Sequence, residues 1–340
     1  MRINSINFID NFYKMYRDND YNFCAVFNQQ LFLSNPSLFN DPFDGFIGLN
    51  KKEFEKEFMA NNNISFVDER SIDAINKKLD YFSNLVSGKN ISSDDLSSEK
   101  NRKIRERINE AYKKYCEKLK EILNDYFICC FTINKPEENM AMWSFYANDY
   151  KGFCVDFSFC KLLYDYGTER VDKYQEFLYK NIHKVKYTDT CISVNWKEIL
   201  KIPFEELSSN YYITKLIKKA LKQKNKQWRY EKEYRLILHK NELLKLTSIV
   251  PNSVLFLKNG CLINFPYTSK IYFNYDIVTD KTKKTLGDIA RKLKIKKLFL
   301  NLSQSNKLLF IDDEKVDYEN LDLLLGNFDN LKKFDDPLPF

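Results

Sequence analysis

Short runs that combine aromatic and polar side chains open the chain and recur along it. In residues 12–17 and 31–34 aromatic and polar side chains alternate, which is typical of short strands with one buried face. A turn-rich stretch with two prolines follows at residues 35–45. We predict further strands at residues 127–131, 152–157, 184–187, 230–238 and 270–275, with a hairpin-like pair at 297–302 and 307–311.

Residues 51–123 differ in character, because Lys, Glu and Asn dominate and apolar residues recur at steps of three and four. This spacing predicts a helix with one apolar stripe, and the basic side chains opposite are expected to be solvated. We interpret the segment as a helical insertion whose loosest loop is 84–98. Residues 137–148, 203–226 and 281–293 are also predicted to be helical. The stripe consists of Ile104, Ile108, Ala111, Tyr115, Leu119 and Ile122.

Strands scattered between helices without a strict strand–helix–strand rhythm predict the α+β class, with a mixed, mostly antiparallel sheet as its core. We expect a single domain over residues 1–340, with the insertion at 51–123 and a frayed tail at 330–340. The 340 residues are 44% hydrophobic and 16% aromatic, which excludes wholesale disorder. Only 8 Gly and 8 Pro occur, so collagen-like and low-complexity classes are excluded too.

Charge and cysteine content bear on compartment and partners. The formal net charge of +7 is modest and spread along the chain, so contact with nucleic acid stays open. The eight cysteines form no C-x-x-C pair and mostly adjoin large apolar residues, which favours reduced thiols. The N-terminus lacks the apolar segment of a signal peptide, and no apolar run has transmembrane length. We therefore expect a cytoplasmic protein without a membrane partner, and we expect no metal site.

The segment 228–238 carries the strongest chemical signal. If it is a strand, Glu231, Glu233 and Arg235 project from one face, because side chains alternate with period two. The apolar residues that follow indicate a partly buried strand, where charged groups need a partner or a function. The simpler interpretation is an exposed strand face with a ladder of Arg–Glu ion pairs.

Two other segments offer ligand contacts. In the turn at 40–45, Asp and Asn side chains most often bond their own backbone, but Asn40 or Asp41 could face a ligand from a stiffened loop. Trp143 and Tyr146 lie one helical turn apart and are more often core residues than a ligand platform.

Taken together, these segments resemble the bacterial family called domain of unknown function 2971. The order and spacing match from about Phe12 to Phe310, and the combination is more specific than any single motif. Phe145 and the pair Asp149-Tyr150 depart mildly from the more polar helix expected of the family. The motifs are Tyr13-Lys14-Met15-Tyr16-Arg17, Ser34-x-x-x-x-Phe39-Asn40-Asp41-Pro42-Phe43-Asp44, Cys130-Phe131 with Met142-Trp143-x-x-Tyr146-Ala147 and Gly152, and Trp228-x-Tyr230-Glu231-x-Glu233-x-Arg235.

A second, weaker resemblance suggests chemistry. An Arg-bearing first strand, a Ser-bearing second strand and a late Glu-x-Glu motif are similar in order to the arginine-modifying ADP-ribosyltransferases, which use NAD and have a split sheet. The resemblance implies that Arg17 anchors a phosphate or ribose of NAD and that Ser34 supports the nicotinamide pocket. Glu233 would hold the ribose 2′-hydroxyl and stabilise positive charge as nicotinamide leaves. Glu231 would orient the acceptor or take its proton.

The same resemblance implies further contacts with NAD. Tyr16 or Trp143 would stack on the nicotinamide ring. Asn40 and Arg235 would line the same concave pocket as the two acids. The leading hypothesis is therefore an intracellular NAD-dependent ADP-ribosyltransferase-like enzyme with an unknown macromolecular acceptor, and an effector role in toxin or phage-defence systems is one expectation.

Two alternatives remain open from the residues. The first is a metal-dependent nuclease in which clustered acids hold magnesium for phosphodiester cleavage, with Lys232 nearby. The second is a non-enzymatic binding module whose acidic and Arg-bearing strand is a structural ion-pair ladder. The acids of the nuclease alternative are Asp41, Asp44, Glu231 and Glu233.

Overall fold

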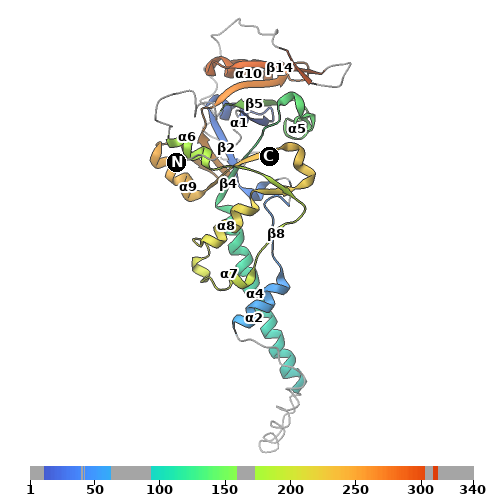
Figure 1. Ribbon diagram of the computed structural model, residues 1–340, viewed down its shortest axis with the longest axis vertical. Coiled ribbons are helices and arrows are strands. Elements are labelled where there is room, and N and C mark those ends of the chain that lie inside the picture. The colour runs from blue at the N-terminus through green and yellow to red at the C-terminus, as the bar shows by residue number, and fades with distance from the viewer. Residues whose placement is uncertain are drawn as a thin grey trace, which may run out of the picture. The chain divides into compact units, whose positions relative to one another are not determined.

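A computed structural model describes residues 11–39, 41, 43–62, 93–158, 173–302 and 309–312 of the chain (Figure 1). The chain divides into two compact units. Unit 1 consists of residues 1–45, 124–190 and 221–340, and unit 2 of residues 46–123 and 191–220. Unit 2 therefore contains the segment 51–123 that was interpreted as an insertion. A single domain with one insertion stays a prediction.

In the described part of unit 1, one 11-stranded sheet forms the centre. Its main path runs β11-β12-β2-β4-β1-β5-β13-β14-β15, and β10 pairs with both β4 and β6. All neighbours are antiparallel except β13 and β14, so the predicted mixed, mostly antiparallel sheet is confirmed. A split like that of ADP-ribosyltransferases stays a prediction. The strands are β1 (Phe12–Tyr16), β2 (Gln30–Ser34), β4 (Tyr126–Thr132), β5 (Phe153–Phe157), β6 (Ile182–Lys184), β10 (Glu233–His239), β11 (Val254–Leu257), β12 (Gly260–Asn264), β13 (Thr268–Asn274), β14 (Lys296–Leu302) and β15 (Leu309–Asp312).

The two faces of this sheet are covered by different helices. On one face, strand residues such as Phe131 and Leu236 share a large apolar core with α1 (Asp20–Phe27), α6 (Lys173–Lys180), α9 (Lys240–Ile249) and α10 (Asp280–Leu293). On the other face, Tyr13, Met15, Cys154 and Tyr272 pack against α5 (Met140–Tyr146). Because strand side chains alternate between faces, the pairing of Tyr13 and Glu233 with Thr132 puts Glu233 and Arg235 on the α5 face.

Short elements complete unit 1 around that face. They are the 3₁₀ helices η1 (Pro36–Leu38), η2 (Pro136–Glu138) and η5 (Lys226–Glu231), and the parallel pair β7 (Lys186–Thr188) and β9 (Gln223–Asn225).

Unit 2 is mainly helical and has an aromatic core. Phe54 and Trp196 are fully buried and meet edge to face with ring centroids 4.8 Å apart. The Tyr112 hydroxyl donates a 2.9 Å hydrogen bond to the carbonyl of Leu49. The elements are β3 (Ile47–Gly48), α2 (Lys51–Asn61), α4 (Ser93–Asn124, its last residue in unit 1), β8 (Ile192–Ser193), α7 (Trp196–Ile199), η4 (Phe204–Glu206) and α8 (Tyr211–Ala220).

Several predicted elements differ from the structure at their edges. The predicted strand 230–238 begins only at Glu233, because the chain forms η5 before it. The predicted helix 203–226 is broken into η4, α8 and the short strand β9. Residues 93–98 of the expected loop 84–98 are helical, whereas the rest of that loop and the tail 330–340 lie outside the described residues.

Candidate functional site

Glu233 opens β10 directly opposite Thr132, the last residue of β4. Tyr13 of β1 pairs with Thr132 from the other side. The beginning of β10 therefore lies at one end of the central strands, on the face that α5 covers. Glu233 and Arg235 are buried there, with 3% and 0% of their surface exposed.

The second acid, Glu231, is the last residue of the 3₁₀ helix η5 and lies close to Glu233. Lys232 follows it in the left-handed conformation (φ 44°, ψ 50°), which ends the helix and turns the chain into β10. Hydrogen bonds from distant residues fix the turn. The Thr132 hydroxyl donates to the carbonyl of Glu231 at 2.5 Å, and the side-chain amides of Asn134 and Asn139 donate to the carbonyl of Tyr230 at 2.6 and 3.2 Å.

Arg235 is held by two carboxylates. Its two terminal nitrogens each lie 2.7 Å from an oxygen of Asp44, a bidentate pair, and its Nε donates to Glu233 Oε1 at 2.6 Å. A further hydrogen bond of 2.9 Å reaches the carbonyl of Leu221. These contacts satisfy the guanidinium although it is fully buried, and burial of an unpaired charge would be costly.

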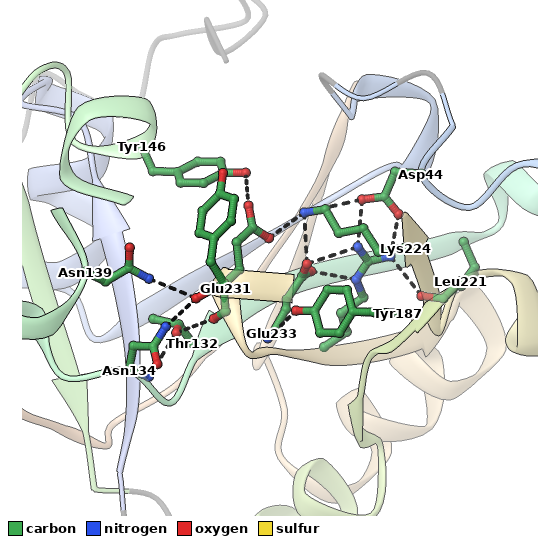
Figure 2. A network of polar contacts seen from close by, with 12 residues as sticks. Asp44, Thr132, Asn134, Asn139, Tyr146, Tyr187, Leu221, Lys224, Glu231 and Glu233 are labelled. Atoms are coloured by element: carbon green, nitrogen blue, oxygen red, sulfur yellow. Dashed lines mark hydrogen bonds and ion pairs between the residues drawn. The ribbon is translucent and has the colours of Figure 1, made fainter. Parts of the chain in front are cut away.

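Lys224, from β9, links the two acids (Figure 2). Its Nζ donates to Glu231 Oε2 at 2.6 Å and to Glu233 Oε2 at 3.0 Å, and it lies 3.8 Å from an oxygen of Asp44. Two tyrosines complete the network. The Tyr146 hydroxyl donates to Glu231 Oε1 at 2.6 Å, and the Tyr187 hydroxyl accepts the backbone N–H of Glu233 at 2.7 Å.

Although both glutamates are buried, their pKa values shift in opposite directions. Burial is the largest influence on Glu231 and raises its pKa to about 6, although the Lys224 ammonium acts against this. Burial also disfavours ionised Glu233, but the Arg235 and Lys224 charges together lower its pKa well below the ordinary value. Glu233 is therefore a permanent anion at neutral pH, whereas Glu231 exchanges a proton close to neutrality.

Of the residues predicted for the site, the structure brings together Glu231, Glu233 and Arg235, and adds Asp44 from the Pro-containing turn. Asn40 lies outside the described residues. The Asp41 carboxylate accepts the backbone N–H of Phe43 at 2.9 Å, which is the self-capping turn expected of Asp.

The other predicted contacts lie elsewhere in unit 1. Trp143 and Tyr16 are buried in apolar clusters, and the Trp143 Nε1 donates to the carbonyl of Pro136 at 2.8 Å. The Ser34 hydroxyl faces the carbonyl of Ile128 at 3.5 Å. In the part of the chain that the structure describes, no hydrogen bond, ion pair or ring contact joins Tyr16, Arg17, Ser34 or Trp143 to the two acids. A single pocket shared by all of them stays a prediction.

Residues 142–236 match the family model described as "Protein of unknown function (DUF2971)". The match supports membership of the DUF2971 family. The matched segment runs from α5 into β10 and contains Tyr146, Tyr187, Lys224, Glu231, Glu233 and Arg235, whereas Asp44, Thr132, Asn134 and Asn139 lie outside it. No curated protein and no solved structure matches the chain.

Sequence reasoning missed Lys224 and Tyr187, and it treated Tyr146 as core. Lys224 lies among other lysines near the end of the predicted helix 203–226, but its side chain is only 6% exposed. A signal for it existed in the DUF2971 motif itself. Two buried acids with a single Arg require another cation, because an unpaired buried carboxylate is strongly disfavoured.

The described residues contain neither a cluster of metal ligands nor a helix that could span a membrane. No group of three or more His, Cys, Asp or Glu side chains there could hold a metal ion. Within the same residues, no helix is both long and apolar enough to cross a membrane.

Proposed function

We propose that this DUF2971 protein is an ADP-ribosyltransferase-like enzyme that cleaves the bond between nicotinamide and ribose in NAD. The two carboxylates of Glu231 and Glu233 are its catalytic groups. Unit 1 contains the whole network.

The convergence of both carboxylates on one cation carries this proposal. The Lys224 ammonium lies 2.6 Å from Glu231 and 3.0 Å from Glu233, in a site with little exposed surface. Two carboxylates that hold a positive charge between them in a dry site have the electrostatics that an oxocarbenium-like transition state needs. Access for the sugar requires Lys224 to give up at least one of these contacts.

The different protonation behaviour of the two acids divides their roles. Glu233, which stays ionised, stabilises the positive charge on the ribose as the C1′–N bond breaks and nicotinamide leaves with the bonding electrons. The acceptor, which is water or a nucleophilic group of a macromolecule, forms the new bond to C1′. Glu231 takes the proton that the acceptor loses, because a base with a pKa of about 6 is mostly ionised at neutral pH.

The acceptor and the biological setting are part of the same proposal. Seven cysteines among the described residues are free thiols, which supports a reducing compartment such as the cytoplasm. A macromolecular acceptor, with nucleic acid as one candidate, fits an effector of toxin or phage-defence systems. No observation favours the nuclease alternative, because Asp44, Glu231 and Glu233 already form ion pairs with Lys224 and Arg235.

The saturated, buried Arg235 favours a second candidate function, a non-enzymatic binding module. Arg235 is fully buried and saturated by Asp44, Glu233 and the carbonyl of Leu221. Such saturation is also expected of an ion network that fixes one arrangement of a fold. On this alternative, unit 1 is a binding module and the network is structural.

Release of nicotinamide from NAD by the purified full chain distinguishes the two candidates. We expect slow release by the wild type, and a rate at least about 100-fold lower for Glu231→Gln and for Glu233→Gln, because each removes a group that acts in the transition state. The matched control is Glu206→Gln, an exposed glutamate of unit 2, which should keep the wild-type rate.

A thermal melt of each variant shows whether it is folded. Wild-type protein that is folded and releases no nicotinamide above background, with or without a cell extract as source of acceptor, would rule out the enzyme proposal. Glutamine variants that stay folded and keep the wild-type rate would rule it out too.

A further inference from the structure

Three aromatic side chains gather on the surface beside Glu231. Phe145, on α5, is 58% exposed, and its ring meets that of Trp228 edge-on with centroids 6.3 Å apart. Trp228 and Tyr230 of η5 are half-buried, and their ring centroids are 6.1 Å apart. Large aromatic rings that remain accessible beside a polar network are typical of ligand sites.

Trp228 is coupled to the acid network through Lys224. The Lys224 ammonium lies 5.1 Å from the centroid of the Trp228 ring and 2.6 Å from Glu231, so the ring and the carboxylate contact the same nitrogen. In a 3₁₀ helix, side chains three residues apart lie on the same side. Trp228 and Glu231 have this spacing in η5.

Hydrogen bonds hold the backbone of η5, which carries Trp228 and Tyr230, at both of its ends. Asn225 caps the start of η5, accepting the backbone N–H of Gln227 at 2.9 Å. The hydrogen bonds from Asn134 and Asn139 to the carbonyl of Tyr230 fix its end. A platform on a fixed turn loses little conformational entropy when a flat ring stacks on it.

Two cations of the same turn have no partner among the residues that the structure describes. Arg229 and Lys232 are exposed, and in the described part of the chain neither side chain forms an ion pair or a hydrogen bond. By contrast, the neighbouring Lys226 pairs with Asp189 at 2.5 Å. Aromatic rings next to free cations match the chemistry of a nucleotide, whose base is flat and whose phosphates are anionic.

We propose that Phe145, Trp228 and Tyr230 bind the planar ring of a nucleotide, and that Arg229 and Lys232 bind its phosphates. This inference rests on the proposed function, since NAD is a dinucleotide, and it gives that function a ring-binding subsite next to Glu231. Stacking on a ligand ring, which the sequence suggested for Tyr16 or Trp143, is assigned here to rings that are accessible, because Tyr16 and Trp143 are buried.

Tryptophan fluorescence tests the inference directly. Of the three tryptophans, Trp143 and Trp196 are fully buried, so Trp228 is the one a bound ring can reach. We expect AMP to quench the emission and to bind with a measurable Kd. Phe145→Ala, which keeps all tryptophans, should weaken AMP binding by about 5- to 100-fold, as expected when one stacking partner is lost. Tyr211→Ala, an aromatic of unit 2 that is 77% exposed, is the control and should not change it.

The phosphate contacts have a separate readout. The double variant Arg229→Glu and Lys232→Glu should weaken AMP binding at least 10-fold and leave adenosine binding unchanged. Binding of an adenine pentanucleotide, measured alongside, shows whether the ring belongs to a free nucleotide or to a nucleic acid. A nucleic-acid site should bind the pentanucleotide more tightly than AMP, and the affinity for the pentanucleotide should fall more steeply with salt.

The outcomes separate this inference from the proposed function. AMP binding that needs Phe145, in a protein without nicotinamide release, would keep the nucleotide subsite and reject the enzyme. Nicotinamide release with the same KM for NAD in wild type and Phe145→Ala would keep the enzyme and reject the subsite. The absence of any AMP-dependent change in Trp228 emission at millimolar concentration would also reject the subsite.

Discussion

Lys232 adopts a backbone conformation that side chains other than glycine seldom adopt. Its φ of 44° lies in the left-handed region, which costs a residue with a Cβ about 1–2 kcal/mol. The left-handed conformation of this one residue turns the chain from η5 into β10. As a result both Glu231 and Glu233 contact the Lys224 ammonium. In a continuous strand their carboxylates would instead lie side by side on one face of the sheet.

The effect of substitutions at Lys232 on stability should therefore depend on how well the new residue tolerates a positive φ, and not on its charge. Lys232→Gly is expected to keep or raise the free energy of unfolding, and Lys232→Val to lower it by about 1–2 kcal/mol, because a β-branched side chain is least tolerated at positive φ. Urea denaturation of both variants measures the difference. Equal destabilisation by Gly and Val would contradict the left-handed turn.

At the residue scale the sequence predicted part of the ion network. Glu231, Glu233 and Arg235 were expected together from their spacing in the chain, and the structure joins them. Asp44 was named as an acid, but its partner Arg235 lies 191 residues away, a pairing that no local pattern contains. Lys224 was missed for a different reason: a lysine among other lysines is usually solvated, whereas the fold buries this one.

At the scale of elements, apolar runs and alternation predicted most strands of the central sheet, including β1, β2, β4, β5 and β13. The order in which those strands pair was not predictable, because it depends on contacts between distant segments. The start of β10 was misplaced for a related reason. Residues 228–231 carry a strand-like sequence, but hydrogen bonds from Thr132, Asn134 and Asn139 hold their carbonyls in a 3₁₀ turn.

Gly152 shows how closely two elements approach beside α5. It follows a left-handed turn after the helix and immediately precedes β5. A Cβ on this residue would lie 2.0 Å from the carbonyl oxygen of Tyr16 and 3.0 Å from that of Ala147. Both atoms belong to the backbone, so neither can move aside as the tip of a side chain can.

We expect Gly152→Ala to lower the free energy of unfolding by about 3 kcal/mol, as overpacking against backbone requires β5 or β1 to shift. The control is Gly287→Ala within α10, where the nearest atom to a new Cβ is the Lys297 ammonium at 3.6 Å. That change should stabilise the protein by about 0.5–1 kcal/mol, because alanine favours a helix interior. Thermal melts of both variants give the comparison, and a neutral Gly152→Ala would show that β1 and β5 do not approach so closely.

At the scale of the whole molecule, the network draws on three separate stretches of the sequence within unit 1. Asp44 comes from residues 1–45, Tyr146 and Tyr187 from 124–190, and Lys224 with the motif acids from 221–340. A network assembled this way forms only when unit 1 folds, so its titration reports on the stability of that unit. The two glutamates then contribute with opposite dependence on pH.

The direction in which Glu231 changes the stability with pH follows from its raised pKa. The folded protein binds this proton more tightly than the unfolded chain, whose value is near the ordinary 4.5. Its contribution to stability is therefore fully present below pH 4.5 and is lost as the pH rises through about 6. Glu233 has the opposite sign, because its pKa is lowered, and its contribution is lost as the pH falls below the ordinary value.

Glu231→Gln removes the first of these contributions and keeps the second. Relative to this variant, the wild type should lose about 1.5 kcal/mol of stability between pH 4.5 and pH 7.5, because the folded protein binds the Glu231 proton with a pKa of about 6 and the unfolded chain with a pKa near 4.5. Urea denaturation of both proteins at the two pH values measures the change, and Glu206→Gln should stay level with the wild type throughout. A gap between wild type and Glu231→Gln that does not change with pH would mean that Glu231 titrates at its ordinary value, and its role as a base near neutrality would then be lost.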